Sequence, residues 1–190
     1  IPKQKKRARQ LIKILTKLGP AYIKIGQALS TRPDVVPPSY LEELTTLQDK
    51  IPSFPNEVAF RFIEEELGAR PEQIYAELSP EPIAAASLGQ VYKGRLKTGE
   101  EVAVKVQRPG LNRRISLDIY IMRSLAGFVQ DNFKQVRSNL RSIIDELAER
   151  IFEETNYNQE GRNADKFQKL YGYIEEIYVP KIYWEYTGTR

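Results

Sequence analysis

Residues 82–107, PIAAASLGQVYKGRLKTGEEVAVKVQ, decide the fold, because they are the only stretch with the pattern of a strand, a tight loop and two further strands. The apolar run from Val91 to Leu96 is separated from Val102–Val106 by Lys-Thr-Gly-Glu at 97–100, a sequence typical of a short hairpin turn. The stretch therefore predicts three antiparallel strands.

The third of these strands places a lysine opposite a row of valines. Side chains alternate between the two faces of a strand. One face is predicted to carry Val102, Val104 and Val106, and the other Ala103, Lys105 and Gln107. Lys105 then lies among apolar neighbours and points away from the valine face, so we expect it to bind an anion.

The loop before the second strand is rich in alanine. A loop of small residues, followed one hairpin later by Val-Ala-Val-Lys, is the layout with which protein kinases cover the phosphates of ATP and hold them with a strand-three lysine. Ala84, Ala85, Ala86 and Ser87 stand where kinases carry Gly-x-Gly, and only Gly89 remains. Because a methyl group makes positive φ costly, we expect a stiff loop that restrains nucleotide binding, and an Ala85→Gly change that tightens it by up to about tenfold. The alternative is an ordinary hairpin with a solvated lysine.

Three further motifs accompany the loop and the strand-three lysine. They are Lys24-Ile25-Gly26-Gln27, Glu154-Thr155-Asn156-Tyr157 and Glu160-Gly161-Arg162-Asn163. In this order the motifs resemble the UbiB/ADCK family of atypical protein-kinase-like proteins, over nearly the whole chain from about Leu18 to Arg190. The signatures of that family are Lys-x-Gly-Gln, an alanine-rich loop, the strand-three lysine and Glu-x-Asp. Here the last motif reads Glu154-Thr155-Asn156 and lacks a carboxylate.

The resemblance implies specific roles for five residues. The helix with Lys24 and Gln27, which share a face because they are three apart, is expected to fold over the nucleotide pocket and block the place of a protein substrate. A kinase-like site pairs one glutamate with the strand-three lysine. We expect Glu160 to pair with Lys105 inside a cleft under the sheet, and Glu154 to be the partner of Lys24. For each carboxylate the alternative is a solvated side chain.

Composition excludes several classes of site. The 190 residues contain no cysteine and no histidine, which excludes disulfides, the usual zinc clusters and a histidine-activated nucleophile. The net charge of +4 comes from 29 basic and 25 acidic residues, which favours mixed surfaces over a dedicated nucleic-acid binder. No run of about 18 apolar residues exists, so nothing in the sequence is predicted to span a membrane.

The first 18 residues predict a basic amphipathic helix that ends at Gly19, before Pro20 opens the next helix. Such a helix can lie on an anionic membrane surface, where reversal of Lys5, Lys6 and Arg9 should weaken binding. It can equally pack on its own domain through its leucines. Nucleic-acid binding by this helix is not expected, because it offers no aromatic platform.

The remaining pattern is mainly helical. Helices are expected at 20–30, at 39 onward with a Ser39/Glu42 capping box, and at 55–67, 71–76, 111–128 and 140–170, with connectors at 32–38 and 130–138. The aromatic segments 177–180 and 182–186 are predicted to add two strands. The predicted fold class is α+β: a protein-kinase-like small lobe at 78–190, with a five-stranded antiparallel sheet, preceded by an all-helical extension at 1–77.

Kinase chemistry also needs a catalytic-loop aspartate and a metal-binding Asp-Phe-Gly, which belong to a second lobe. The sequence contains no Asp-Phe-Gly. We therefore expect this chain to correspond to the amino-terminal half of a family member, to be inactive alone, and to rely on the second lobe for the ligands of Mg²⁺.

The resemblance implies the ATP-binding half of an atypical kinase or ATPase, with ATP and Mg²⁺ as cofactors. Such proteins support isoprenoid quinone or other prenyl-lipid metabolism at membranes. The expected partners are a nucleotide, an anionic membrane surface and prenyl-lipid enzymes, and the expected place is peripheral, at a bacterial inner membrane or inside a plastid or mitochondrion. The alternative is a catalytically silent pseudokinase or a lipid-binding scaffold, which Asn156 in place of the aspartate favours.

Overall fold

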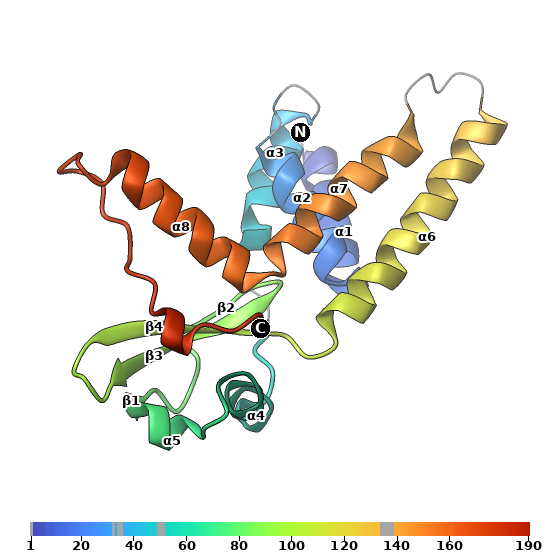
Figure 1. Ribbon diagram of the computed structural model, residues 1–190. Helices are drawn as coiled ribbons and strands as arrows, with labels where there is room; N and C mark the ends of the chain where they lie inside the picture. Colours follow the sequence, from blue (N-terminus) through green and yellow to red (C-terminus); the bar gives the residue numbers. More distant parts are fainter. Residues whose placement is uncertain (1, 32, 34–35, 49–51, 134–138) are drawn as a thin grey trace.

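The computed structural model describes residues 2–31, 33, 36–48, 52–133 and 139–190. Its helices are α1 (Pro2–Leu18), α2 (Pro20–Ser30), α3 (Pro38–Thr45), η1 (Thr46–Gln48), α4 (Asn56–Leu67), α5 (Pro71–Ile74), α6 (Leu111–Asn132), α7 (Leu140–Glu154), α8 (Tyr157–Tyr171) and η2 (Trp184–Tyr186). Its strands are β1 (Tyr75–Leu78), β2 (Ala84–Ala85), β3 (Gly89–Leu96) and β4 (Glu101–Gln107). Figure 1 shows α4 and α5 on one side of the small sheet and the other long helices on the opposite side.

Strand β3 is the centre of an antiparallel sheet. Strand β4 pairs with it from Glu101 to Gln107, while β1 and β2 pair with its two ends. The hairpin expected at 97–100 joins β3 to β4, with Gly99 at a φ of 106°. The register places Ala84 opposite Val91, and Val91 opposite Lys105, so these three side chains form one row.

The two faces of the sheet differ as predicted. On one face Tyr92, Leu96 and Val106 are buried against Ala59 and Ile63 of α4. Tyr92 also donates a hydrogen bond to the Asn56 side chain at 2.7 Å. The other face, with Val91, Ala103 and Lys105, is less buried and is free to form a site.

Two further clusters hold the helices together. Ile23, Leu44 and Leu47 join α2, α3 and η1. The other cluster brings residues from α2, α6 and α7 around Leu88 of the loop before β3; its members are Ala21, Leu88, Leu111, Ile115, Ile119 and Ile151. The alanine-rich loop is therefore anchored in the helical core.

The prediction of two strands in the aromatic segments 177–180 and 182–186, and with it a five-stranded sheet, is wrong for the described residues. Segments 177–180 and 182–186 form no ladder, and Trp184–Tyr186 is a short 3₁₀ turn. The aromatic side chains are used for packing: Tyr183 and Tyr186 lie against the sheet core, and the Trp184 indole donates to Asp165 of α8 at 2.9 Å. Pro180 also has no N–H for a ladder. The fold remains α+β, with a sheet of four strands.

The helix expected at 140–170 is two helices, because the chain bends at Thr155 and Asn156 between α7 and α8. Helix α6 extends to Asn132, beyond the expected end at Phe128, and residues 134–138 of the expected linker lie outside the described residues. Residues 32 and 34–35 of the first expected connector do so as well.

Two other boundaries also differ from the prediction. The Ser39/Glu42 capping box is absent: the N-cap of α3 is Pro37, and Glu42 instead forms an ion pair with Lys5 of α1 at 2.7 Å. The sheet begins at Tyr75, so residues 1–77 are not entirely helical. Helix α4, which lies in the expected extension, packs on the sheet.

Candidate functional site

Two cavities meet at Lys105 and Glu160, between β4 and α8. The first, which we call the apolar cavity, has a volume of about 560 Å³, and its walls include Val91 and Ala103. The second, which we call the polar cavity, has a volume of about 690 Å³ and lies between loop residues 86–89 and charged side chains of α2, α7 and α8. Both cavities contain Lys105 and Glu160 in their walls, so this pair lies at their junction.

The expected partner of Lys105 is present. Its Nζ donates to the two carboxylate oxygens of Glu160 at 2.6 and 2.9 Å. Glu160 lies in the first turn of α8, and Lys105 of β4 reaches it from the sheet face opposite α4. The expected burial is wrong, because the two side chains are 39% and 55% exposed and both open to the cavities. A role in phosphate binding stays a prediction.

The second expected pair is also present. Lys24 of α2 forms an ion pair with Glu154, the last residue of α7, and both line the polar cavity. The contact joins the amino-terminal helices to the helix pair that carries Glu160. Its functional role likewise stays a prediction.

Gln27 does not lie where the resemblance placed it. Its Nε2 donates to the carbonyl of Leu47 at 3.3 Å, and it lines neither cavity. The reason is the neighbouring Gly26, which packs closely against Leu15, Leu44 and Leu47. This close packing brings Gln27 within hydrogen-bond reach of Leu47 in η1, whereas Lys24 on the same face extends to Glu154 and the polar cavity.

Asn156, which stands in place of the family aspartate, is the N-cap of α8. Its side-chain oxygen accepts a hydrogen bond from the backbone N–H of Gln159 at 3.2 Å. Asparagine and aspartate are about equally good at this position. The departure from the family motif therefore preserves the start of the helix that presents Glu160.

The alanine-rich loop is not strained. Ala84 and Ala85 are the two residues of β2, and no residue from 84 to 89 has a positive φ. The turn is closed by a hydrogen bond from the N–H of Ala86 to the carbonyl of Gly89 at 2.7 Å. The expected cost of alanine at positive φ is therefore absent.

The comparisons with known proteins identify the family. The profile of the ABC1 atypical kinase-like domain matches residues 46–190. The chain belongs to the ABC1 family. Its ABC1 relatives include an uncharacterized protein of Synechocystis sp., 71% identical over 184 residues that cover 97% of this chain and 27% of the relative. Protein ACTIVITY OF BC1 COMPLEX KINASE 3, chloroplastic, of Arabidopsis thaliana is 50% identical over 187 residues, which cover 98% of this chain and 26% of that protein.

A solved structure has the same fold. The Rv3197–erythromycin complex from Mycobacterium tuberculosis matches this ABC1 chain with a TM-score of 0.62 and 30% identity, over 97% of this chain and 46% of that one. The chain thus spans about a quarter of the curated ABC1 relatives, at 27% and 26% of their lengths. The resemblance to atypical kinase-like proteins is confirmed.

Two residues that lie beside the Lys105–Glu160 pair were assigned no role by the sequence analysis. Arg108, directly after β4, donates from Nε to the carbonyl of Ala86 and from its backbone N–H to the carbonyl of Leu88. Tyr157, the first residue of α8, lies under the ammonium group of Lys105. Arg108 carried no sequence signal. Tyr157 could have been found, because Asn156 followed three residues later by Gln159 is an N-cap signature.

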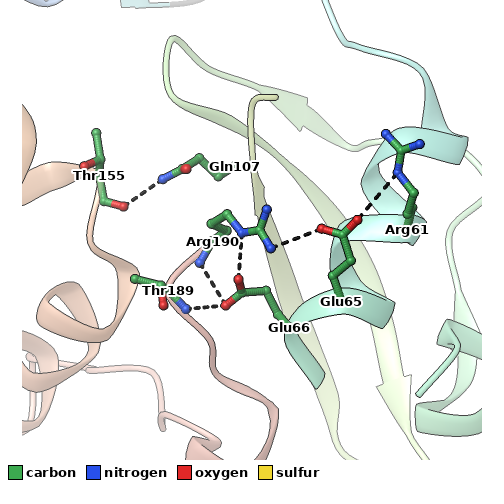
Figure 2. Close-up of polar contacts among 7 residues, drawn as sticks. All are labelled: Arg61, Glu65, Glu66, Gln107, Thr155, Thr189 and Arg190. Atoms are coloured by element: carbon green, nitrogen blue, oxygen red, sulfur yellow. Dashed lines mark hydrogen bonds and ion pairs between the residues drawn. The ribbon is translucent and has the colours of Figure 1, made fainter. Parts of the chain in front are cut away.

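Figure 2 shows the contacts that Thr189 and Arg190 make with Glu65 and Glu66 of α4. The Glu66 carboxylate of α4 accepts hydrogen bonds from Thr189 N–H and Arg190 Nε, both at 2.7 Å. The carbonyl of Thr189 accepts from Tyr157 N–H at 3.3 Å, and that of Arg190 from Gln107 N–H at 2.9 Å. Burial alone would raise the pKa of Glu66, but these donors outweigh it and lower the pKa. Residues 189–190 thus connect α4, the end of β4 and the start of α8.

A further hydrogen bond ties β4 to the bend between α7 and α8. The buried Gln107 side chain donates to the carbonyl of Thr155 at 2.7 Å (Figure 2).

Within the described ranges, no cluster of three or more acidic side chains could hold a metal ion. The helices among those residues also include none that is both long and apolar enough to cross a bilayer.

Proposed function

We propose that this chain forms the nucleotide-binding part of an ABC1 atypical kinase or ATPase, and that Lys105 binds phosphate groups of ATP. The observation that carries the proposal is the position of the Lys105–Glu160 pair at the junction of an apolar and a polar cavity. A nucleotide has the same division, with an apolar base at one end and a charged phosphate chain at the other.

The two cavities fit a nucleotide in size and chemistry. The apolar cavity, at about 560 Å³, is within the usual range for small-molecule sites, and Val91 and Ala103 offer flat apolar contacts for a base. Lys24 and Arg150 add positive charge to the polar cavity, where the phosphates would lie. Glu153 and Glu154 also line it and would repel phosphate. Magnesium bound by the phosphate oxygens would offset that repulsion.

Titration calorimetry of the intact protein with ADP and Mg²⁺ tests the proposal. Lys105→Ala should weaken binding by about tenfold or more, because it removes a charge-assisted contact. Lys93→Ala is a matched control: Lys93 lies on the same sheet face, pairs with Glu101 at 3.2 Å and lines neither of the two cavities. Absence of ADP binding by the unaltered protein, or equal weakening by both changes, would contradict the proposal.

The second candidate is a silent pseudokinase or scaffold that binds nucleotide without turnover. The observation that favours it is Asn156, which supplies no carboxylate to the site. The two candidates differ in one measurement, since an ATPase releases phosphate from ATP and a scaffold does not. Asn156→Asp keeps an N-cap and restores the carboxylate, so a gain of phosphate release in this variant would favour the scaffold for the natural sequence.

We also propose that α1 contacts an anionic lipid surface. Leu11, Ile14 and Leu18 are exposed and share one face of the helix, and Lys3 and Arg7 continue that face toward its start. Apolar side chains beside basic ones are typical of helices that lie in the membrane interface.

Two of the three basic residues expected to make this contact, Lys5 and Arg9, are paired with carboxylates of α3. They form ion pairs with Glu42 and Glu43, at 2.7 and 2.9 Å, so carboxylates of the same chain already offset their positive charges. Reversal of Lys3 and Arg7 should instead weaken binding to vesicles with anionic lipid, and the effect should shrink at high salt. Equal binding to neutral and anionic vesicles would contradict the contact.

The biological setting that we propose is prenyl-lipid or quinone metabolism, with enzymes of that pathway as partners. The resemblance to the UbiB/ADCK family supports it. Relatives in Synechocystis sp. and chloroplast relatives in Arabidopsis thaliana support a cyanobacterial or plastid location with peripheral membrane contact. Quinone profiles of cells without the protein test this setting, and unchanged profiles would contradict it.

A further inference from the structure

Tyr157 lies between Lys105 of β4 and the alanine-rich loop. The Lys105 Nζ is 4.5 Å from the centre of the Tyr157 ring. Glu160, three residues later on the same helix, holds the same ammonium group at 2.6 Å. The lysine therefore has a carboxylate and a ring face as neighbours, and both belong to the first turn of α8.

Gly89 leaves the space that the Tyr157 side chain occupies. A Cβ atom at position 89 would lie 2.6 Å from the Tyr157 hydroxyl oxygen and 2.5 Å from the carbonyl oxygen of Val106. The φ of Gly89 is not positive, so its backbone conformation does not require glycine. Space for the tyrosine and for the neighbouring strand is the reason that remains.

The ring of Tyr157, rather than its hydroxyl, makes the useful contact. The residue is only 8% exposed, and its hydroxyl has no hydrogen-bond partner among the described residues. Burial raises the pKa of this hydroxyl, so the group is neutral at physiological pH. A neutral tyrosine ring attracts a cation through the negative potential of its face.

We propose that Tyr157 is a positioning residue for Lys105, and that the missing side chain at Gly89 leaves room for the hydroxyl end of this tyrosine as well as for the Val106 carbonyl. The proposal rests on the proposed nucleotide site and adds to it a device that sets the position of the ammonium group. The ring and Glu160 hold this group from two directions, and the contact with Gly89 couples its position to the alanine-rich loop. In this proposal Gly89 makes space for the Tyr157 side chain and does not form a phosphate-binding turn.

Substitutions that change the ring potential without changing its shape test the proposal. Tyr157→Phe keeps the ring and should keep the affinity of the intact protein for ADP within about twofold. Pentafluorophenylalanine at position 157 keeps the shape but removes the negative potential, and should weaken ADP binding by about threefold to thirtyfold. Adenosine, which has no phosphate for Lys105 to contact, should bind all three proteins equally. In a Lys105→Ala background the fluorinated residue should have no further effect.

A second measurement does not depend on nucleotide. Acetylation of Lys105 by limiting acetic anhydride, followed by peptide mass spectrometry, reports how well the ammonium group is held and covered. The rate should rise severalfold with pentafluorophenylalanine and not with Tyr157→Phe, while Lys93 serves as the internal reference.

The two measurements separate the proposals. Failure of the unaltered protein to bind ADP would remove the proposed nucleotide site, and the acetylation rate would still decide the role of Tyr157. A fluorinated residue that leaves the Lys105 rate unchanged would overturn that role. Equal weakening of ADP and adenosine binding would also overturn it, because this result indicates a general packing effect.

Discussion

Arg108 donates a hydrogen bond from its Nε to the carbonyl oxygen of Ala86 at 3.0 Å, so an arginine behind the sheet holds the alanine-rich loop in place. Its other contacts extend this role: the guanidinium also donates to Pro52 at 2.6 Å, and the backbone N–H donates to Leu88 at 2.9 Å. Burial lowers the pKa of Arg108, although the group stays charged at neutral pH. One planar guanidinium thus ties Ala86 of the loop to Pro52, and we expect these hydrogen bonds to stiffen the loop.

Arg108→Lys should loosen the loop without a change of charge. A lysine ammonium cannot reach Ala86 and Pro52 with the geometry of a guanidinium, so one or both carbonyls lose their partner. We expect a loss of about 1–3 kcal/mol in the free energy of unfolding and faster hydrogen exchange at the Ala86 amide. Hydrogen-exchange mass spectrometry of residues 84–90 measures it. Arg95→Lys, in an exposed ion pair of β3 with Glu101, is the control and should leave this peptide unchanged.

Ala85→Gly should not tighten nucleotide binding, contrary to the expectation from the sequence. Ala85 is a strand residue opposite Gln90, with an ordinary φ, so glycine relieves no strain. Glycine in a strand instead costs about 0.5–1 kcal/mol through the entropy of the unfolded chain. Calorimetry with ADP and thermal unfolding of the same variant measure both effects. A tenfold gain in affinity would show that the loop does limit binding.

The parts of the fold that the sequence predicted are those specified by local chemistry. Gly99 supplies the positive φ of the hairpin, Gly68 ends α4 at a φ of 71°, and Pro20 begins α2 after Gly19. Each depends on the conformational range of one residue, which a reader of the sequence knows in advance. The alternation of valines around Lys105 is local in the same sense.

The features that the sequence did not predict depend on contacts between distant segments. The aromatic segment 182–186 has the alternation of a strand, but its Tyr183 and Tyr186 pack on a core formed by α4 and the sheet, and nothing in the segment itself indicates this. Arg108 meets Ala86 across 22 residues of chain. The partners of Lys24 and Lys105 came from the family resemblance, because any of several helical glutamates could have served. The break before α8 was not predicted either, but it is specified locally, because Asn156 carries an N-cap signal.

Glu66→Gln should destabilise the junction of α4, β4 and α8. The carboxylate is 18% exposed and accepts hydrogen bonds from Thr189 and Arg190, so a neutral amide should cost about 1–3 kcal/mol. Because the pKa of Glu66 is lowered, its contribution is present above the usual glutamate pKa of about 4.3 and is lost as the pH falls through the folded-state pKa.

Thermal unfolding of Glu66→Gln at neutral and acidic pH measures this contribution. Glu65→Gln is a matched control, because Glu65 pairs with the same arginine at 3.1 Å but is 45% exposed. Exposed ion pairs contribute little, so the control should change stability by less than about 1 kcal/mol. A Glu66 variant that unfolds like the control at every pH would contradict the bracing role of residues 189–190.

Asp118 is a buried carboxylate whose contribution to stability changes with pH in the direction opposite to that of Glu66. It lies on α6 with 8% exposure, and its Oδ2 has no hydrogen-bond partner among the described residues. Burial raises its pKa, and Arg114 on the same helix offsets only part of the rise. Burial raises the pKa of the Tyr22 hydroxyl of α2, and the nearby Asp118 carboxylate raises it further. The folded protein therefore holds a proton on Asp118 more tightly than the unfolded chain does.

Asp118→Asn should stabilise the protein at neutral pH. Because the folded-state pKa is raised, the aspartate is tolerated below its usual pKa of about 3.9, and stability is lost as the pH rises through the raised value. The asparagine has no charge to desolvate, so the variant should gain about 1 kcal/mol or more at pH 7, and this gain should vanish toward pH 4. Thermal unfolding between pH 4 and 8 measures it. Asp131→Asn, at an exposed carboxylate of the same helix that pairs with Arg141, should show no such gain. A gain for Asp118→Asn that is the same at all pH values would mean that packing, and not the charge, limits stability at this position.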